Sequence, residues 1–348
     1  MRVLIDLQHP AHLHFFRNLI TRLRKEGHAV CVTGRDKDIL VALAKQYKID
    51  MRVFGKARKG IGNLWLEFIW REVNLLRIIR SFKPEVILAV AGSYVSALGK
   101  ILNIPVYIFY DTEHAHLSNM IAYPFASHIF VPKCYRKPIR WSHTRYNGYH
   151  ELAYLHPNYF QPNPLVLKDL GIDPDEIFSL VRFVAWAAAH DIGRRGFTEK
   201  NRVRAVKELS RFGKVFISYE GEIPEELEPY RLRLEYRQIH HLMAYAALIF
   251  GESATMASEG AILGIPGIFV DPVGRGYTDE LETEYGLVFN FSPTAQRQSI
   301  DKAVSILVGY DRDHWRAKAA RLVKEKVDVT EMLCALLADI KLTAISLP

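Results

Sequence analysis

The sequence predicts two α/β domains in tandem, each built on a doubly wound parallel sheet. Short apolar runs alternate with helical patterns along both halves of the chain. The alternation weakens once, between about 150 and 175, where four prolines crowd together as in a linker. The chain has 348 residues, enough for two domains with separate cores. Strands separated by helices pair in parallel through right-handed crossovers, and ligands bind where the carboxyl ends of such strands meet.

In the first half, apolar runs predict strands and amphipathic stretches predict helices. The expected strands are 2–7, 29–33, 85–90, 105–110 and 128–131. The expected helices are 15–25, 36–47 and 94–102. Four apolar side chains of the first helix share one face: Phe16, Leu19, Ile20 and Leu23.

The alternation restarts in the second half. The expected strands are 179–185, 214–219, 247–250 and 267–270, and the expected helices are 199–212, 239–246, 254–263 and long segments from 295 to 340. We therefore expect two Rossmann-like domains, 1–160 and 161–348, that face each other across a cleft, with the final helices packing back on the first domain.

Composition limits the class of protein. Hydrophobic residues make up 49% and charged residues 24%, as in soluble globular proteins, and no apolar run is long enough to span a membrane. The first residues do not predict a signal peptide. Three distant cysteines disfavour a disulfide framework or a cysteine zinc site, which fits a reducing cytoplasm. The net charge of +8 suggests anionic partners such as nucleotide phosphates, anionic lipid or nucleic acid.

The segment 251–266 follows an apolar strand and opens a helix. Gly251 allows the turn, and Ser253 or Thr255 can cap the helix, whose free N–H groups favour a phosphate. Glu259 lies one to two turns into the helix, where a carboxylate can accept two hydrogen bonds from a ribose diol. The alternative is a capped helix with a solvated glutamate.

This segment resembles the nucleotide-binding motif of glycosyltransferase B enzymes. It is most similar to that of lipid-linked N-acetylglucosaminyltransferases and UDP-N-acetylglucosamine 2-epimerases. In those families a Ser or Thr at the helix start meets the diphosphate and a Glu holds the ribose, which Ser253 and Glu259 match. The resemblance implies a nucleotide site that also includes Gly251, Thr255 and Met256.

The whole chain resembles an uncharacterised archaeal and bacterial family described as glycosyltransferase-like. The motifs that carry this resemblance are 8–16, 148–155 and 255–266. Two departures stand out from the peptidoglycan transferases. The first loop has His9-Pro10-Ala11-His12 in place of a glycine-rich run, and residues 187–190 are Ala-Ala-Ala-His in place of a glycine-serine loop.

Loops of the first domain carry the candidate catalytic residues. His12 matches the loop histidine of the transferases and can act as a general base on an acceptor hydroxyl, unless it is only hydrogen-bonded within its loop. Asp111 and Glu113 follow the strand 105–110, where the epimerases place an acidic proton-transfer residue; the alternative is a helix cap. Gly92 and Ser93 resemble the second glycine loop of the transferases, whose amides can hold an acceptor phosphate.

A loop of the second domain carries the candidate diphosphate ligands. Gly193 gives flexibility, and Arg194 and Arg195 can neutralise a leaving diphosphate in place of a metal. The segment 277–280 corresponds to the contact with the donor sugar in the transferases. Two histidine pairs, 12/14 and 114/116, could meet Asp111 on a metal ion, but no metal motif supports this, so we expect no metal and no cofactor.

These features favour a metal-independent glycosyltransferase that moves a sugar from a nucleotide-sugar, expected to be UDP-linked, to a polysaccharide or glycolipid acceptor. The first alternative is a 2-epimerase of a UDP-sugar that uses Glu113 and Asp111. The second is a non-catalytic binder of anionic carbohydrate or nucleic acid, supported by the basic segments 56–59 and 231–233 but by no nucleic-acid motif.

The stretch 56–80 predicts reversible contact with an anionic membrane surface. A basic cluster precedes a helix with a wide apolar arc that includes Trp65 and Trp70. A narrow polar face is expected at Glu67, Arg71, Asn74 and Arg77. The alternative is a helix buried on both sides, against the sheet and a neighbouring helix or a second copy of the chain.

Overall fold

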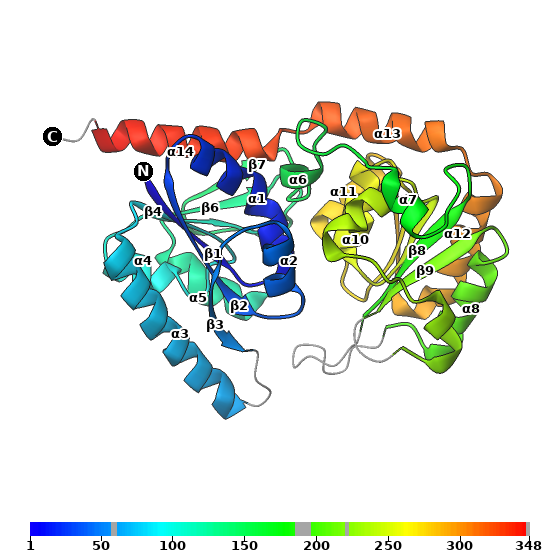
Figure 1. Cartoon of the computed structure of the whole chain (residues 1–348), viewed down its shortest axis with the longest axis horizontal. Helices are drawn as coiled ribbons and strands as arrows, with labels where there is room; N and C mark the ends of the chain where they lie inside the picture. The colour runs from blue at the N-terminus through cyan, green and yellow to red at the C-terminus, as the bar shows by residue number, and fades with distance from the viewer. Residues whose placement is uncertain (57–60, 185–195, 220–222, 346–348) are drawn as a thin grey trace. The chain divides into compact units, whose positions relative to one another are not determined.

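The chain forms two compact units in a computed structural model that describes residues 1–56, 61–184, 196–219 and 223–345, with the backbone alone at 56, 61–69, 116 and 341–345. Unit 1 comprises Met1–Tyr154 and Val327–Pro348, and unit 2 comprises Leu155–Lys326 (Figure 1). Each unit has its own parallel sheet.

The sheet of unit 1 has seven parallel strands in the order β3-β2-β1-β4-β5-β6-β7. The strands are β1 (Arg2–Leu7), β2 (Ala29–Asp36), β3 (Arg52–Lys56), β4 (Val86–Val90), β5 (Val106–Phe109), β6 (His128–Pro132) and β7 (His143–Tyr146). The strand order reverses between β1 and β4, which is the switch point where doubly wound sheets bind ligands. The central strand β4 is a continuous apolar run and Asp6 alone interrupts that of β1 after Arg2, as expected for strands that helices cover on both faces.

The helices of unit 1 cover both faces of its sheet (Figure 1). They are α1 (Pro10–Lys25), α2 (Leu40–Gln46), α3 (Ile61–Phe82), α4 (Ser96–Ile101), α5 (His116–Ala122) and α14 (Val329–Ile345). The four predicted core residues of α1 are all buried. The C-terminal helix α14 packs on α1, and Thr330 Oγ1 donates to the carbonyl of Ala153 at 2.7 Å. Helices α3, α4 and α5 lie on the opposite side of the sheet from α14 (Figure 1).

The sheet of unit 2 has five parallel strands in the order β12-β11-β10-β8-β9. The strands are β8 (Phe178–Phe183), β9 (Lys214–Tyr219), β10 (Leu248–Gly251), β11 (Gly267–Val270) and β12 (Val288–Phe291). Its longer helices are α8 (Glu199–Leu209), α10 (Ala254–Ile262), α11 (Gly276–Thr283), α12 (Gln296–Val308) and α13 (Arg312–Glu325), and the shorter α9 spans Ile239–Met243. The order reverses between β8 and β10.

The predicted fold class, two doubly wound parallel sheets, is confirmed, with three strands that the sequence pattern missed. These are β3, β7 and β12, and each lies at the edge of its sheet. Helix α1 also begins earlier than expected, at Pro10, because His9 caps it and proline suits a first helical position. No helix in the described ranges is long and apolar enough to cross a bilayer.

Candidate functional site

The first turn of α1, which follows β1 directly, places His12 at the switch point of unit 1. The backbone N–H of Gln8 donates to Nδ1 of His12 at 3.2 Å, so the neutral ring carries its hydrogen on Nε2. Burial lowers the pKa of His12 well below its ordinary value, and His9 and His150 lower it further. In this tautomer His12 offers a hydrogen-bond donor rather than the lone pair of a general base. The predicted role of His12 as a base stays a prediction.

The two neighbouring histidines, His9 at the N-cap of α1 and His14 within it, have structural partners. His9 Nδ1 accepts from the N–H of Ala11 at 3.2 Å and caps α1. His14 is buried and stacks on Tyr154, with ring centroids 5.1 Å apart. The packing of His14 on Tyr154 does not support the 12/14 half of the predicted metal site. The side chain of His116, in the other pair, lies outside the described residues, and those residues contain no cluster of metal ligands.

The loop after β5 brings Asp111 against His150, a residue that follows β7. Oδ2 of Asp111 lies 3.3 Å from Nδ1 of His150, and Thr112 Oγ1 donates to the other carboxylate oxygen at 2.9 Å. The carboxylate therefore places the hydrogen of His150 on Nδ1 and leaves a lone pair on Nε2. This Nε2 is buried and, within the described ranges, has no hydrogen-bond partner.

The environment keeps His150 neutral. His150 is 8% exposed as a residue, and its ring packs on Phe15, with centroids 4.5 Å apart. Burial lowers the pKa of His150, and the charge of Asp111 opposes that shift without reversing it. An imidazole held in one tautomer by a carboxylate, with an unpaired Nε2, can take a proton from a hydroxyl group that reaches it. The sequence motif 148–155 contained His150, but no pattern assigned its partner.

The predicted acid Glu113 is placed differently from Asp111. Its side chain is 7% exposed and accepts from the backbone N–H of Arg136 at 3.3 Å. The predicted glycine loop after β4 has left-handed backbone at Ala91 and Gly92, with φ of 66° and 70°. A Cβ at Gly92 would meet Cγ2 of Ile108 at 2.4 Å, so glycine is required. The Ser93 hydroxyl shares a hydrogen bond with Ser118 at 2.6 Å.

A buried ion pair at the same switch point was missed. Asp6 on β1 and Arg71 on α3 are both 0% exposed, and Arg71 Nη2 lies 2.9 and 3.1 Å from the two carboxylate oxygens of Asp6. Thr33 Oγ1 donates to the same carboxylate at 2.8 Å. The expected polar surface face of α3 is thus wrong at Arg71, because this cation turns inward to the acid of β1. An acid inside an apolar strand was the available signal.

Glu72, the next residue on α3, predicts a pH-dependent stability. Burial raises the pKa of its carboxyl to about 7; the charge of Asp6 adds to the shift and that of Arg71 opposes it. The folded chain then binds a proton that the unfolded chain has lost, so stability falls as pH rises from about 4.5 through 7. Glu72→Gln is expected to stabilise the chain at pH 8 by on the order of 1 kcal/mol after solvent screening, and by much less at pH 5, which lies just above the unfolded pKa.

Urea unfolding at the two pH values measures this difference. Asp50→Asn, at an exposed acid of the same unit, is the control and should show no pH-dependent gain. An equal gain for Glu72→Gln at pH 5 and pH 8 would contradict the assignment.

In unit 2 the predicted phosphate loop joins β10 to α10. Gly251 has φ of 144°, and a Cβ there would meet the carbonyl oxygen of Arg182 at 2.0 Å. Ser253 caps α10 by accepting from the N–H of Met256 at 3.2 Å. Thr255 and Met256 form the first turn and are partly exposed, and Met256 also packs against the unit 2 core. The loop thus presents a capped helix N-terminus at a strand's carboxyl end.

Glu259 points to a histidine rather than to open solvent. It is 5% exposed, and Oε1 lies 2.8 Å from Nε2 of His240 on α9. The solvated glutamate of the alternative interpretation is therefore excluded. Whether Glu259 also holds a ribose stays a prediction. The candidate diphosphate ligands Gly193, Arg194 and Arg195 lie outside the described residues.

Glu252 is a further buried acid that the sequence did not single out. Its oxygens accept from the N–H of Val184 at 2.9 Å and of Phe197 at 2.6 Å. Arg202 Nη2 lies 3.4 Å from Oε2. One carboxylate thus joins the end of β8 to the chain that precedes α8. The segment 277–280 lies in the first half of α11, where Thr278 Oγ1 accepts from the backbone N–H of Arg275 at 3.2 Å.

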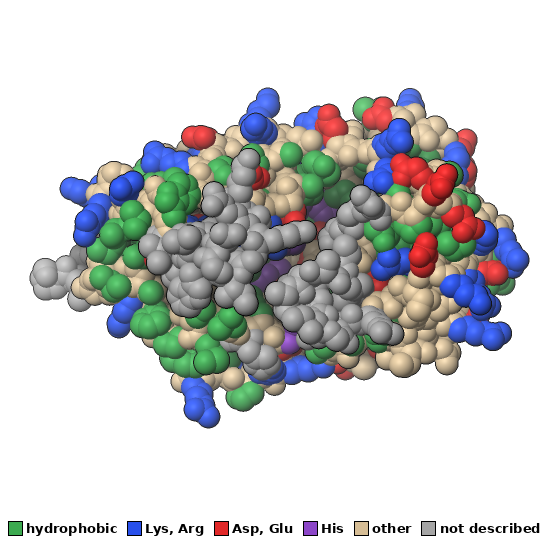
Figure 2. Space-filling view, turned by 90° about the horizontal axis from the view of Figure 1, so that it is seen from below, with side chains coloured by type: hydrophobic (Ala, Val, Ile, Leu, Met, Phe, Trp, Pro, Cys, Tyr) green, Lys and Arg blue, Asp and Glu red, His purple; other side chains and the backbone are tan. Residues whose placement is uncertain are grey.

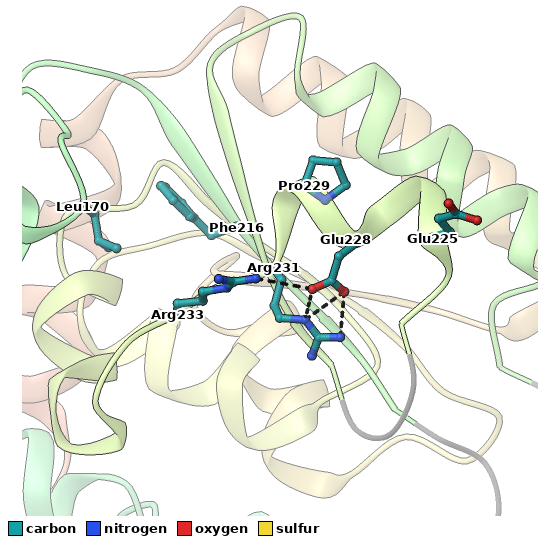
Figure 3. A pocket seen from close by; sticks show the side chains of 7 residues that line it. All are labelled: Leu170, Phe216, Glu225, Glu228, Pro229, Arg231 and Arg233. Atoms are coloured by element: carbon teal, nitrogen blue, oxygen red, sulfur yellow. Dashed lines mark hydrogen bonds and ion pairs between the residues drawn. The ribbon is translucent and has the colours of Figure 1, made fainter.

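A surface pocket of unit 2 is lined by other residues (Figure 3): Leu170, Phe216, Glu225, Glu228, Pro229, Arg231 and Arg233. Arg231 grips the carboxylate of Glu228, with Nε 2.8 Å from Oε1 and Nη2 2.7 Å from Oε2. Arg233 lies 3.7 Å from the same carboxylate. Since Glu228 neutralises part of this basic segment, the segment offers weaker support for nucleic-acid binding.

Known proteins resemble this chain at the level of family and fold. A family model described as a protein of unknown function (DUF354) matches residues 1–290. The uncharacterised protein MJ0665 of Methanocaldococcus jannaschii is 26% identical over 286 residues, 78% of this chain and 82% of the relative.

Two solved structures illustrate the fold. UDP-GlcNAc 2-epimerase from Neisseria meningitidis, bound to UDP-GlcNAc, has a TM-score of 0.69 at 13% identity and covers 97% of this chain and 100% of its own. MurG of Acinetobacter baumannii has a TM-score of 0.57 at 13% identity, with coverage of 97% and 100%. The fold is therefore of the glycosyltransferase B type.

Proposed function

Since the chain belongs to the DUF354 family of proteins of unknown function, we propose its activity from the site: transfer of a sugar from a UDP-sugar to a hydroxyl group of a carbohydrate or lipid-linked acceptor. The observation that carries the proposal is the Asp111–His150 pair, a neutral imidazole whose buried Nε2 has no hydrogen-bond partner among the described residues, at the strand ends of unit 1. The similar epimerase structure bound to UDP-GlcNAc supports the choice of donor.

In the proposed reaction, His150 Nε2 takes the proton of the acceptor hydroxyl. The acceptor oxygen then bonds to the anomeric carbon as the bond from that carbon to the diphosphate breaks, which inverts the anomeric centre. Asp111 stabilises the imidazolium that forms. The start of α10 at Ser253 and the pair Arg194 and Arg195 stabilise the leaving diphosphate, with no divalent metal.

Turnover of a panel of UDP-sugars with carbohydrate and polyprenyl-phosphate acceptors tests this proposal, with and without EDTA. Acceptor-dependent release of UDP that EDTA leaves unchanged is the expected result. Activity lost with EDTA and restored by magnesium or manganese would contradict metal independence.

Epimerisation of a UDP-sugar is the second candidate, favoured by the two acids Asp111 and Glu113 on one loop at the end of β5. It predicts turnover of the UDP-sugar with no acceptor present. Formation of a 2-epimer under those conditions would favour it over transfer.

Glu259 is expected to support UDP binding. Its carboxylate is buried on α10, so loss of a charged hydrogen bond to the ribose should cost about 1.5–3 kcal/mol, a fall in affinity of roughly 10- to 150-fold. Calorimetric titration of UDP into wild type and Glu259→Ala measures it. Glu284→Ala, an exposed glutamate of the same unit, is the control. Since His240 pairs with Glu259, a melting curve of each variant must show a folded protein. Equal affinity for UDP in folded Glu259→Ala would reject the ribose role.

Unit 1 is proposed to meet an anionic membrane reversibly, where a lipid-linked acceptor is presented. Four large apolar side chains of α3, α4 and α5 are more than half exposed: Trp70, Ile101, Leu117 and Met120. Figure 2 shows hydrophobic side chains gathered on the unit 1 part of one face, with Lys and Arg at its edge. Apolar rings and chains beside cations suit a lipid headgroup layer.

The wild-type chain is expected to sediment with anionic liposomes at low salt. A variant in which both Leu117 and Met120 are changed to Asp is expected to stay in the supernatant. Val308→Asp removes an equally exposed apolar side chain from unit 2 and should sediment as wild type does. Absence of sedimentation of the folded wild type at low salt would favour a soluble acceptor or a contact between two copies of the chain.

A further inference from the structure

The guanidinium of Arg71 is only partly satisfied by its ion pair. Nη2 serves both oxygens of Asp6, while Nε and Nη1 are buried and have no hydrogen-bond partner in the part of the chain that the structure describes. Asp6 itself is well supplied, because Thr33 and Gln8 also donate to it. A buried donor without an acceptor is costly, and Arg71 leaves two such nitrogens. The cluster therefore has more hydrogen-bond donors than acceptors.

The position of this cluster is that of a ligand site. Asp6 is near the carboxyl end of β1, and the ring of Tyr94, which follows β4, lies 4.4 Å from the guanidinium carbon of Arg71. These two strands flank the point where the sheet order reverses. The loop between β4 and α4 also holds Ala91 in a left-handed conformation that costs a non-glycine residue energy. Strain of this kind is concentrated at binding sites and switching segments.

We propose that Arg71 is the anion-binding residue of a site in unit 1, and that it accepts the phosphate or carboxylate group of the acceptor substrate. An oxyanion supplies the acceptors that Nε and Nη1 lack, and arginine binds such groups through several N–H donors at once. The neighbouring ring of Tyr94 holds the guanidinium in place by a cation–π contact. Since Arg71 is 0% exposed, an anion can reach it only when the groups around it move. The identity of the anion as part of the sugar-acceptor substrate rests on the proposed function, whereas the anion site itself does not.

Thermal melting of the full chain tests the site with two probes, sodium phosphate and sodium acetate, each against sodium chloride at equal ionic strength. A specific anion raises the melting temperature by binding the folded state. If only phosphate raises the melting temperature, the site is specific for a phosphate group. If acetate raises it as well, the site accepts carboxylates too.

Two variants separate binding from structure. Arg71→Lys keeps a cation for Asp6 but removes the extra N–H groups, so the apparent affinity for the anion should fall at least tenfold. Asp6→Asn keeps Arg71 and removes its competing carboxylate, so the affinity should rise at least tenfold. A purely structural ion pair predicts lower stability in both variants and the same anion-dependent gain as in wild type. That result, or no gain in wild type, would overturn the proposal.

If Arg71→Lys does not fold, the affinity of Asp6→Asn for the anion tests the proposal by itself: a rise supports the site, and no rise overturns it. The affinity for UDP, whose proposed site is in unit 2, should be unchanged in both variants. If the chain binds phosphate through Arg71 but does not bind UDP, the anion site stands and the proposed function is rejected. If the chain binds UDP but Arg71 does not bind phosphate, the anion site is rejected and the proposed function stands.

Discussion

Replacing His150 with Gln is expected to lower kcat/KM of sugar transfer by about 10²- to 10⁴-fold, the usual contribution of a general base. Glutamine fills a similar volume but cannot take the acceptor proton. Asp111→Asn should give a loss of similar size, because it no longer fixes the hydrogen of His150 on Nδ1. His12→Gln is the matched control. Since the His12 tautomer makes it a donor, its loss should act mainly on KM.

The pH profile separates a base from a structural residue. Burial lowers the pKa of His150, so wild-type kcat/KM should stay high to below pH 6.5 before it falls. The charge of Asp111 raises that pKa, so in Asp111→Asn the acidic limb should move to still lower pH while the plateau drops. A His12→Gln variant without activity, together with an active His150→Gln, would return the role of base to His12.

The core of each sheet could be predicted because its strands are buried on both faces. The strand β4 is five apolar residues, and the helix α1 repeats its apolar residues at helical spacing. The hydrophobic pattern did not predict the strands β3, β7 and β12, because edge strands are partly solvated and carry polar residues. His143-Thr144-Arg145-Tyr146 has no apolar run, and its pairing with β6 alone makes it a strand.

The sequence could predict where in the fold the candidate site lies, but not which side chains pair with each other there. Parallel strands end at one edge, so His12 and Asp111 could be assigned to that edge from the pattern alone. The partner of Asp111 is His150, and the partner of Asp6 is Arg71, 65 residues away. No local period encodes such distant pairs. An acid in an otherwise apolar strand still predicts that some cation reaches it.

Replacing Glu252 with Ala is expected to destabilise unit 2 by about 3–5 kcal/mol, the usual cost of breaking a buried charged network. The change leaves the amides of Val184 and Phe197 without this acceptor and Arg202 without this carboxylate. Glu252→Gln keeps one acceptor oxygen and should lose about half as much. The urea midpoint of unit 2, followed by the fluorescence of Trp315 in a chain whose other four tryptophans are changed to Phe, measures both, because Trp315 is a buried residue of that unit.

Glu228→Ala is the control for this measurement, since it removes a glutamate that also pairs with an arginine of unit 2 but at the surface. It should leave the midpoint unchanged, because an exposed ion pair adds little. A Glu252→Ala midpoint equal to that of Glu228→Ala would show that the buried carboxylate is not needed for folding. Val184 and Phe197 flank the segment that contains Arg194 and Arg195. Loss of their common acceptor should therefore also weaken UDP binding in Glu252→Ala, even under conditions where unit 2 stays folded.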